Sequence, residues 1–273
     1  MAAPLFDKNP FLILWELTRA CDLACRHCRA SAVAERNPFE LSLKECLRVL
    51  DQIQDLGSPL VVLTGGDPLK RPDVFDIVRA GSSRGLRMTM TPSGTPLLTD
   101  EAVQKLAGEG LARLAVSLDG PDAASHDGFR RVPGSFGHTW RGIEAAHKYG
   151  LPLQINTSFC RANLNAFEEM AELVRKAGAV LWSVFFVVPV GRASFEDELS
   201  ADEFERLFEK MADLAGRVPF DIKSTAAPHY RRYLLQRNGR PTGPAADSRS
   251  AAGMVGGEGW RALRGVNDGN GLL

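Results

Sequence analysis

The sequence has few cysteines, no excess of charge of either sign and no long hydrophobic run. Five cysteines in 273 residues are too few for a disulfide scaffold, so a reducing, cytoplasmic setting is expected. The 33 basic residues balance the 33 acidic ones, which argues against a protein that acts on nucleic acid or on an anionic membrane. Residues 180–190 are the most apolar stretch and fall short of the roughly 18 residues of a membrane span. Residues 1–10 lack the pattern of a secretory signal.

The chain alternates between strand-like and helix-like patterns, as expected of an α/β protein. Capping residues mark three predicted helix starts, at Ser42, Asn165 and Ser200. Alternation of this kind predicts a parallel sheet with crossover helices, and it leaves a partial (β/α)6 barrel and a doubly wound sheet open. In both architectures, ligands bind at the carboxyl ends of the strands. The predicted strands are residues 11–18, 60–64, 86–91, 111–118, 153–159 and 180–188.

Three of the five cysteines lie within eight residues, directly after the first predicted strand. Cys21, Cys25 and Cys28 have the spacing C-x3-C-x2-C. Three thiols cannot all pair in disulfides, so zinc and an iron–sulfur cluster are the metals to consider. Structural zinc takes four ligands, and His27 is a poor fourth ligand because it adjoins Cys28. A [4Fe–4S] cluster on three thiolates would keep one iron open, which favours the cluster over zinc.

The cysteine spacing at the end of a first strand resembles the radical S-adenosylmethionine (SAM) superfamily, in which an aromatic residue typically precedes the last cysteine, as His27 does here. Three further segments extend the resemblance over about residues 10–235. Thr64-Gly-Gly-Asp-Pro68 resembles the GGE motif, and Ser117-Leu-Asp-Gly120 resembles the motif of the fourth strand. Residues 126–136 resemble a segment of the SPASM-type subgroup. The resemblance implies a partial (β/α)6 barrel, one [4Fe–4S] cluster and SAM.

The resemblance also implies a site. Cys21, Cys25 and Cys28 would bind the cluster, whose open iron would take the amino and carboxylate groups of SAM. The backbone of the Gly-Gly pair and the Asp67 carboxylate would meet the SAM ammonium group, although the same residues also suit an ordinary turn. The predicted cofactor-binding residues are His27, Gly65, Gly66, Asp67, Ser117, Asp119, Arg130, Asn156 and Pro189. No catalytic residue beyond these is predicted.

The other polar residues near these motifs have simpler interpretations. Lys70 and Arg71 read as a solvated surface pair, and Glu16 as an interior carboxylate that could touch substrate. Cys46 lies on the apolar face of a predicted helix and reads as a core residue.

The expected organisation is a lead-in at residues 1–10, the barrel at 11–218, a short strand and helix at 219–237, and an irregular tail at 238–273. No cysteine follows Cys160, so we expect the chain to lack the Cys-rich SPASM extension, as a minimal or truncated version of such proteins. The predicted function is reductive cleavage of SAM to a 5′-deoxyadenosyl radical that abstracts hydrogen from a peptide or porphyrin-like substrate. Flavodoxin or ferredoxin would donate the electron. The alternatives are a catalytically incompetent barrel that acts as a binding module, and a zinc protein.

Overall fold

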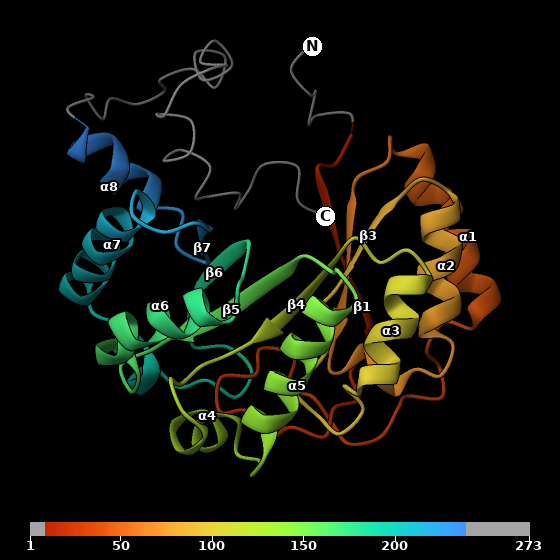
Figure 1. The fold of residues 1–273 in the computed structure, drawn as a ribbon, viewed down its shortest axis with the longest axis horizontal. Coiled ribbons are helices and arrows are strands. Elements are labelled where there is room, and N and C mark those ends of the chain that lie inside the picture. Colours follow the sequence, from red (N-terminus) through yellow and green to blue (C-terminus); the bar gives the residue numbers. More distant parts are fainter. Residues whose placement is uncertain (1–8, 239–273) are drawn as a thin grey trace.

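Seven parallel strands form one curved sheet in the computed structural model, which describes residues 9–238 (Figure 1). The strands follow one another in chain order across the sheet, and this order confirms the predicted partial barrel. A doubly wound sheet is excluded, because its strand order reverses at a switch point. The strands are β1 (Leu12–Thr18), β2 (Leu60–Gly65), β3 (Arg87–Met90), β4 (Arg113–Ser117), β5 (Leu153–Phe159), β6 (Leu181–Phe186) and β7 (Asp221–Thr225).

The helices follow one another around the outer side of the curved sheet (Figure 1). Capping boxes at Ser42 and Ser200 open two of them, as predicted. The predicted start at Asn165 is wrong: residues 164–166 form a 3-10 turn, and the helix begins at Phe167 without a side-chain cap. The helices are α1 (Leu43–Asp55), α2 (Val74–Ser83), α3 (Asp100–Gly108), α4 (Ala123–Arg130), α5 (Ser135–Lys148), α6 (Phe167–Lys176), α7 (Ala201–Ala215) and α8 (Tyr230–Arg237), and the 3-10 turns are η1 (Pro68–Lys70), η2 (Leu164–Ala166) and η3 (Phe195–Asp197).

The short C-terminal strand that the sequence predicts is the seventh strand of the same sheet. In β7, Ile222 lies opposite Trp182 of β6, so the sheet continues beyond the six predicted units. The predicted irregular tail lies outside the described residues, apart from Asn238. In the part of the chain that the structure describes, no helix is long and apolar enough to cross a membrane.

The main hydrophobic core lies between the outer face of the sheet and the helices. Val61, Leu114, Ile155 and Trp182 are buried there, and Cys46 of α1 joins them as predicted. Successive residues of a strand point to opposite faces of the sheet. The strand residues next in sequence to these buried ones therefore point to the inner side of the curve. That inner face carries many polar residues, among them Glu16, Thr64, Thr89, Arg113, Ser117, Gln154, Asn156 and Ser183.

Candidate metal centre and cofactor site

The three clustered cysteines lie in residues 19–33, the cysteine loop, which begins where β1 ends. The end of β2 fixes the start of this loop. The Gly66 N–H donates to the Thr18 carbonyl and the Asp67 N–H to the Ala20 carbonyl, both at 2.7 Å. A Cβ on Gly66 would lie 2.3 Å from the Ala20 oxygen, so only glycine fits there. In the structure, therefore, the Gly-Gly pair allows close approach of the cysteine-loop backbone.

The end of α4 fixes the middle of the cysteine loop. The Ala24 N–H donates to the Arg130 carbonyl at 3.3 Å, and the Arg26 N–H donates to the Phe129 carbonyl at 3.2 Å. These carbonyls belong to the last turn of a helix and have no partner within it, so the loop satisfies them. Arg26 also forms an ion pair with the buried Asp197 of η3.

Each sulfur of the cysteine loop accepts a hydrogen bond. The Leu23 N–H points to the Cys21 Sγ at 3.4 Å, the Arg130 guanidinium to the Cys25 Sγ at 3.5 Å, and the Ala32 N–H to the Cys28 Sγ at 3.5 Å. Donors aimed at sulfur favour the thiolate, and hydrogen bonds to sulfur are a feature of iron–sulfur sites. The core thiol of Cys46 also accepts from the Arg71 guanidinium, at 3.7 Å, and donates to the Leu41 carbonyl at 3.8 Å, so hydrogen bonds to sulfur alone do not single out the cysteine loop.

Buried polar atoms beside the cysteine loop also fit a bound group. The Nδ1 of His27 and the Nε of Arg130 are buried without a hydrogen-bond partner among residues 9–238. Buried nitrogens of this kind are costly unless a ligand or water satisfies them. Within the described ranges, no three metal-binding side chains converge on one point. A [4Fe–4S] cluster needs no such convergence, because each thiolate binds a different iron.

A buried ion pair joins β4 to α4 beside Cys25. The Asp119 Oδ2 lies 2.5 Å from an Arg130 nitrogen, and the other Asp119 oxygen accepts from the Ser158 N–H at 2.7 Å. Burial works to raise the pKa of Asp119, but Arg130, neighbouring groups and the Ser158 N–H together outweigh it, and the pKa lies below its usual range. Asp119 is therefore an anion that neutralises Arg130, and it leaves the Arg130 Nε for a further acceptor.

The two histidines near this ion pair are neutral at physiological pH. Burial lowers the pKa of His27 to about 4, and its ring packs on Phe129 with 4.6 Å between centroids. Burial, with Arg130, also lowers the pKa of His126 to about 4. The His126 Nδ1 accepts from the Asp119 N–H at 3.2 Å, so this histidine supports the turn that presents Asp119.

The pKa of His126 predicts a pH-dependent stability. An unfolded histidine titrates near pH 6.5, so between about pH 6.5 and the folded value of about 4 the unfolded state binds the extra proton. The contribution of His126 is complete above that window, and the free energy of unfolding falls by about 1.4 kcal/mol per pH unit as the pH drops through it. Urea unfolding across the window, compared between the wild type and His126→Gln, measures this slope. If stability falls equally with pH in the wild type and in His126→Gln, then His126 is not the group responsible.

Asp67 follows the Gly-Gly pair and uses both of its oxygens within the protein. One oxygen accepts from the N–H groups of Leu69 and Ser93, at 3.1 and 3.3 Å, and the other accepts from the Thr95 hydroxyl at 2.8 Å. The side chain is buried, and burial raises its pKa. Ser93 in turn contacts the Cys21 Sγ at 3.3 Å. The geometry supports Asp67 as a residue that positions the turn, and its predicted contact with SAM stays a prediction.

Ser117 and Asn156 lie side by side on the inner face, where β4 pairs with β5. The Asn156 Oδ1 accepts from the Gln154 amide at 2.8 Å, which leaves its NH2 group toward the inner face. Strand β6 ends at Phe186, so Pro189 lies in the loop that follows. Its side chain is half-buried there. The structure thus brings the predicted residues to the carboxyl ends of the strands, and their contacts with SAM stay predictions.

Gly191 and Arg192, in the loop after β6, are site residues that the sequence analysis missed. The Arg192 guanidinium donates to the Cys25 and Ala32 carbonyls, at 2.9 and 3.1 Å, and its N–H donates to the Cys28 carbonyl. A Cβ on Gly191, whose φ is 66°, would lie 2.3 Å from the Cys28 oxygen. The loop after β6 therefore closes over the cysteine loop.

Arg192→Ala should loosen the cysteine loop. The substitution removes two charge-assisted hydrogen bonds, each worth about 1.5–3 kcal/mol, so amide hydrogen exchange in residues 21–33 should accelerate at least tenfold. Exchange followed by mass spectrometry, with Arg192→Lys as an intermediate variant that keeps the charge, measures the effect. Unchanged exchange in that segment would show that Arg192 does not hold the loop.

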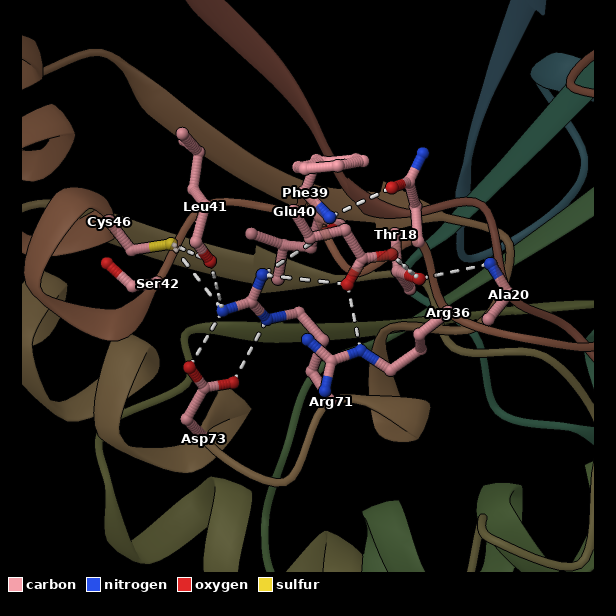
Figure 2. Close-up of polar contacts among 12 residues, drawn as sticks. Thr18, Ala20, Arg36, Phe39, Glu40, Leu41, Ser42, Cys46, Arg71 and Asp73 are labelled. Carbon is pink, nitrogen blue, oxygen red and sulfur yellow. Dashed lines mark hydrogen bonds and ion pairs between the residues drawn. The ribbon is translucent and has the colours of Figure 1, made fainter.

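The prediction of Arg71 as a solvated surface residue is wrong. Arg71 is 1% exposed and lies between Asp73, at 2.7 Å, and the Leu41 carbonyl, at 2.9 Å (Figure 2). It also lies 4.0 Å from Glu40, which accepts from the Thr18 hydroxyl at 2.5 Å. Through Thr18, this network holds the end of β1 in place and so supports the first residues of the cysteine loop.

Comparison with known proteins identifies this arrangement. The family model described as "Radical SAM superfamily" matches residues 15–183, which include the cysteine loop, β2 to β5 and parts of β1 and β6. The chain belongs to the radical SAM superfamily. The cofactors of this superfamily are a [4Fe–4S] cluster and SAM. The radical SAM fold thus agrees with the sulfur donors and unsatisfied nitrogens described above.

The radical SAM relatives include enzymes named as a heme synthase and as a maturase. The chain is 43% identical to the AdoMet-dependent heme synthase of Nitratidesulfovibrio vulgaris over 237 residues, covering 85% of this chain and 64% of that protein. It is 30% identical to the mycofactocin maturase MftC of Mycolicibacterium smegmatis, over 77% of this chain and 53% of that protein. The solved structure of SuiB from Streptococcus suis, bound to S-adenosylmethionine, has the same fold, with a TM-score of 0.72, 17% identity and coverage of 83% of this chain and 53% of that one. The chain thus spans less than two thirds of the length of these relatives.

Proposed function

We propose that this chain is the radical SAM core of an enzyme that acts on a porphyrin-like tetrapyrrole, in a reducing cytoplasmic setting. The observation that carries the proposal is the 43% identity to an AdoMet-dependent heme synthase over 237 residues. Identity to the mycofactocin maturase is lower, at 30%, so a tetrapyrrole is favoured over a peptide. An electron donor such as flavodoxin or ferredoxin would supply the reducing electron.

The residues of the site have separable parts in this function. When bound, the cluster supplies one electron that splits SAM into methionine and a 5′-deoxyadenosyl radical. Cys21, Cys25 and Cys28 would hold the cluster. The donors to their sulfurs favour the thiolate form, while burial holds the pKa of Cys21 above its usual value. Arg130, neutralised by Asp119, presents its free Nε toward a carboxylate, for which a guanidinium is geometrically suited. Ser117 and Asn156 line the inner face side by side.

Anaerobic reconstitution of the full chain tests this function. The protein would be loaded with iron and sulfide, reduced with dithionite, and assayed for 5′-deoxyadenosine with SAM alone and with iron coproporphyrin III. We expect about four iron per chain and faster 5′-deoxyadenosine formation with the tetrapyrrole. Iron without 5′-deoxyadenosine would favour an incompetent binding module instead. Zinc in place of iron would overturn the assignment of the cysteine loop.

A further inference from the structure

The inner face of the sheet carries two arginines at some distance from the cysteine loop. Arg113 is the first residue of β4, and its sequence neighbour Leu114 is buried in the outer core, so Arg113 faces the inner side. Its partner across the ladder is Thr89 of β3. Arg87 lies two residues before Thr89 and therefore shares the same face. The two arginines are diagonal neighbours on adjacent strands.

Asp221 of β7 acts on Arg113 only at longer range, and the Arg113 guanidinium forms neither an ion pair nor a hydrogen bond within residues 9–238. It is nevertheless half-buried, and burial lowers its pKa, with Arg87 adding to the effect and Asp221 of β7 opposing it. Arg71 and Arg130 behave differently, since each pairs with an aspartate. A partly buried guanidinium without a partner costs stability, which is typical of a group kept for a ligand.

The level of the inner face that carries Arg113 turns apolar two strands away. The register places Leu14 of β1, Val62 of β2, Thr89 of β3 and Arg113 of β4 at one level across four strands. Leu14 is 46% exposed, although it is a large aliphatic residue within the sheet. One level of the inner face is therefore apolar on β1 and β2, carries Thr89 on β3 and is basic on β4.

We infer that Arg113, assisted by Arg87, binds a carboxylate of the substrate while Leu14 and Val62 contact its flat apolar ring. The inference rests on the proposed function, because a porphyrin-like tetrapyrrole combines an apolar macrocycle with propionate side chains. Guanidinium suits carboxylate in a bidentate geometry. Arg113 lies four residues before Ser117 on the same strand, roughly 13 Å at the rise of a parallel strand. That separation suits an anchor for a part of the substrate that does not react.

Binding of two tetrapyrroles tests this site in the full chain. The probes are iron coproporphyrin III and its tetramethyl ester, titrated in the same detergent and followed by absorbance. Arg113→Met should raise the Kd of the acid at least tenfold, or about 1.4 kcal/mol, and leave the Kd of the ester unchanged. Arg113→Lys should fall between, since lysine offers only a point charge. Arg48→Met, on the exposed side of α1, is the matched control and should change neither Kd.

The outcomes separate this site from the proposed function. If the wild type binds the acid and Arg113→Met binds it equally well, the carboxylate site is wrong and the tetrapyrrole function stands. If the wild type binds neither probe, the tetrapyrrole function fails and the site fails with it. The melting temperature of Arg113→Met should equal or exceed that of the wild type, because the lost charge has no partner. A lower melting temperature would mark Arg113 as structural and overturn the inference.

Discussion

Cys25→Ala is expected to lose the cluster and all 5′-deoxyadenosine formation. Removal of a residue that hydrogen-bonds to a metal ligand lowers metal affinity by roughly 10–100-fold. Removal of one of the three thiolate ligands should lower it further. The substitution also removes the sulfur that accepts from Arg130, so the site loses a ligand and an electrostatic contact together. Iron content and visible absorbance after anaerobic reconstitution measure the loss directly, without any assay of activity.

The two remaining cysteines are the matched controls. Cys46 is in the main core and Cys160 in a small separate apolar cluster, and both are buried. Cys46→Ala and Cys160→Ala should keep the iron content of the wild type, even if they lower the melting temperature. Full iron in Cys25→Ala, or loss of iron in Cys46→Ala, would contradict the assignment of the cluster to the cysteine loop.

Asp119→Ala is expected to destabilise the protein by about 3–5 kcal/mol, the cost of leaving one member of a buried ion pair alone. The substitution leaves the Arg130 charge buried, and it removes the acceptor of the Ser158 N–H. Urea unfolding of the protein without cluster measures the loss. The double variant Asp119→Leu/Arg130→Met should recover part of it, because no uncompensated charge remains. Equal stability of the single and double variants would show that the pair is not energetically coupled.

Local patterns in the sequence predicted much of this fold. The apolar runs and capping boxes at Ser42 and Ser200 predicted the alternation of strands and helices, since both signals act over a few residues. The C-x3-C-x2-C spacing predicted the position of the metal centre for the same reason. The start of α6 was wrong because the Asn165 side chain does not cap it; Asn163 is the residue that bonds locally, accepting from the Cys160 N–H.

The anchors of the site were less predictable because they act across long separations in sequence. Arg192 lies 167 residues from the carbonyl it contacts at Cys25, and nothing in its local sequence marks it. Arg71 looked like a surface charge, since a buried guanidinium and a solvated one share the same local pattern. The sequence held one indication of this contact, the glycine in the Val-Gly-Arg run after a predicted strand. In the structure Gly191 has a positive φ and lies close to the backbone of the cysteine loop.

The long separation between Cys25 and Arg192 has a consequence for synthesis of the chain. The three cysteines leave the ribosome early, but the arginine that closes over them follows 167 residues later. At about 5–20 residues per second, that delay is roughly 8–33 seconds. In the first part of this interval the nascent thiols have neither the α4 carbonyls nor Arg192 to order them, and in the rest of it they lack Arg192. We therefore expect iron and sulfide to be loaded after the sixth strand has been translated. Before that point the free thiols most need protection from oxidation.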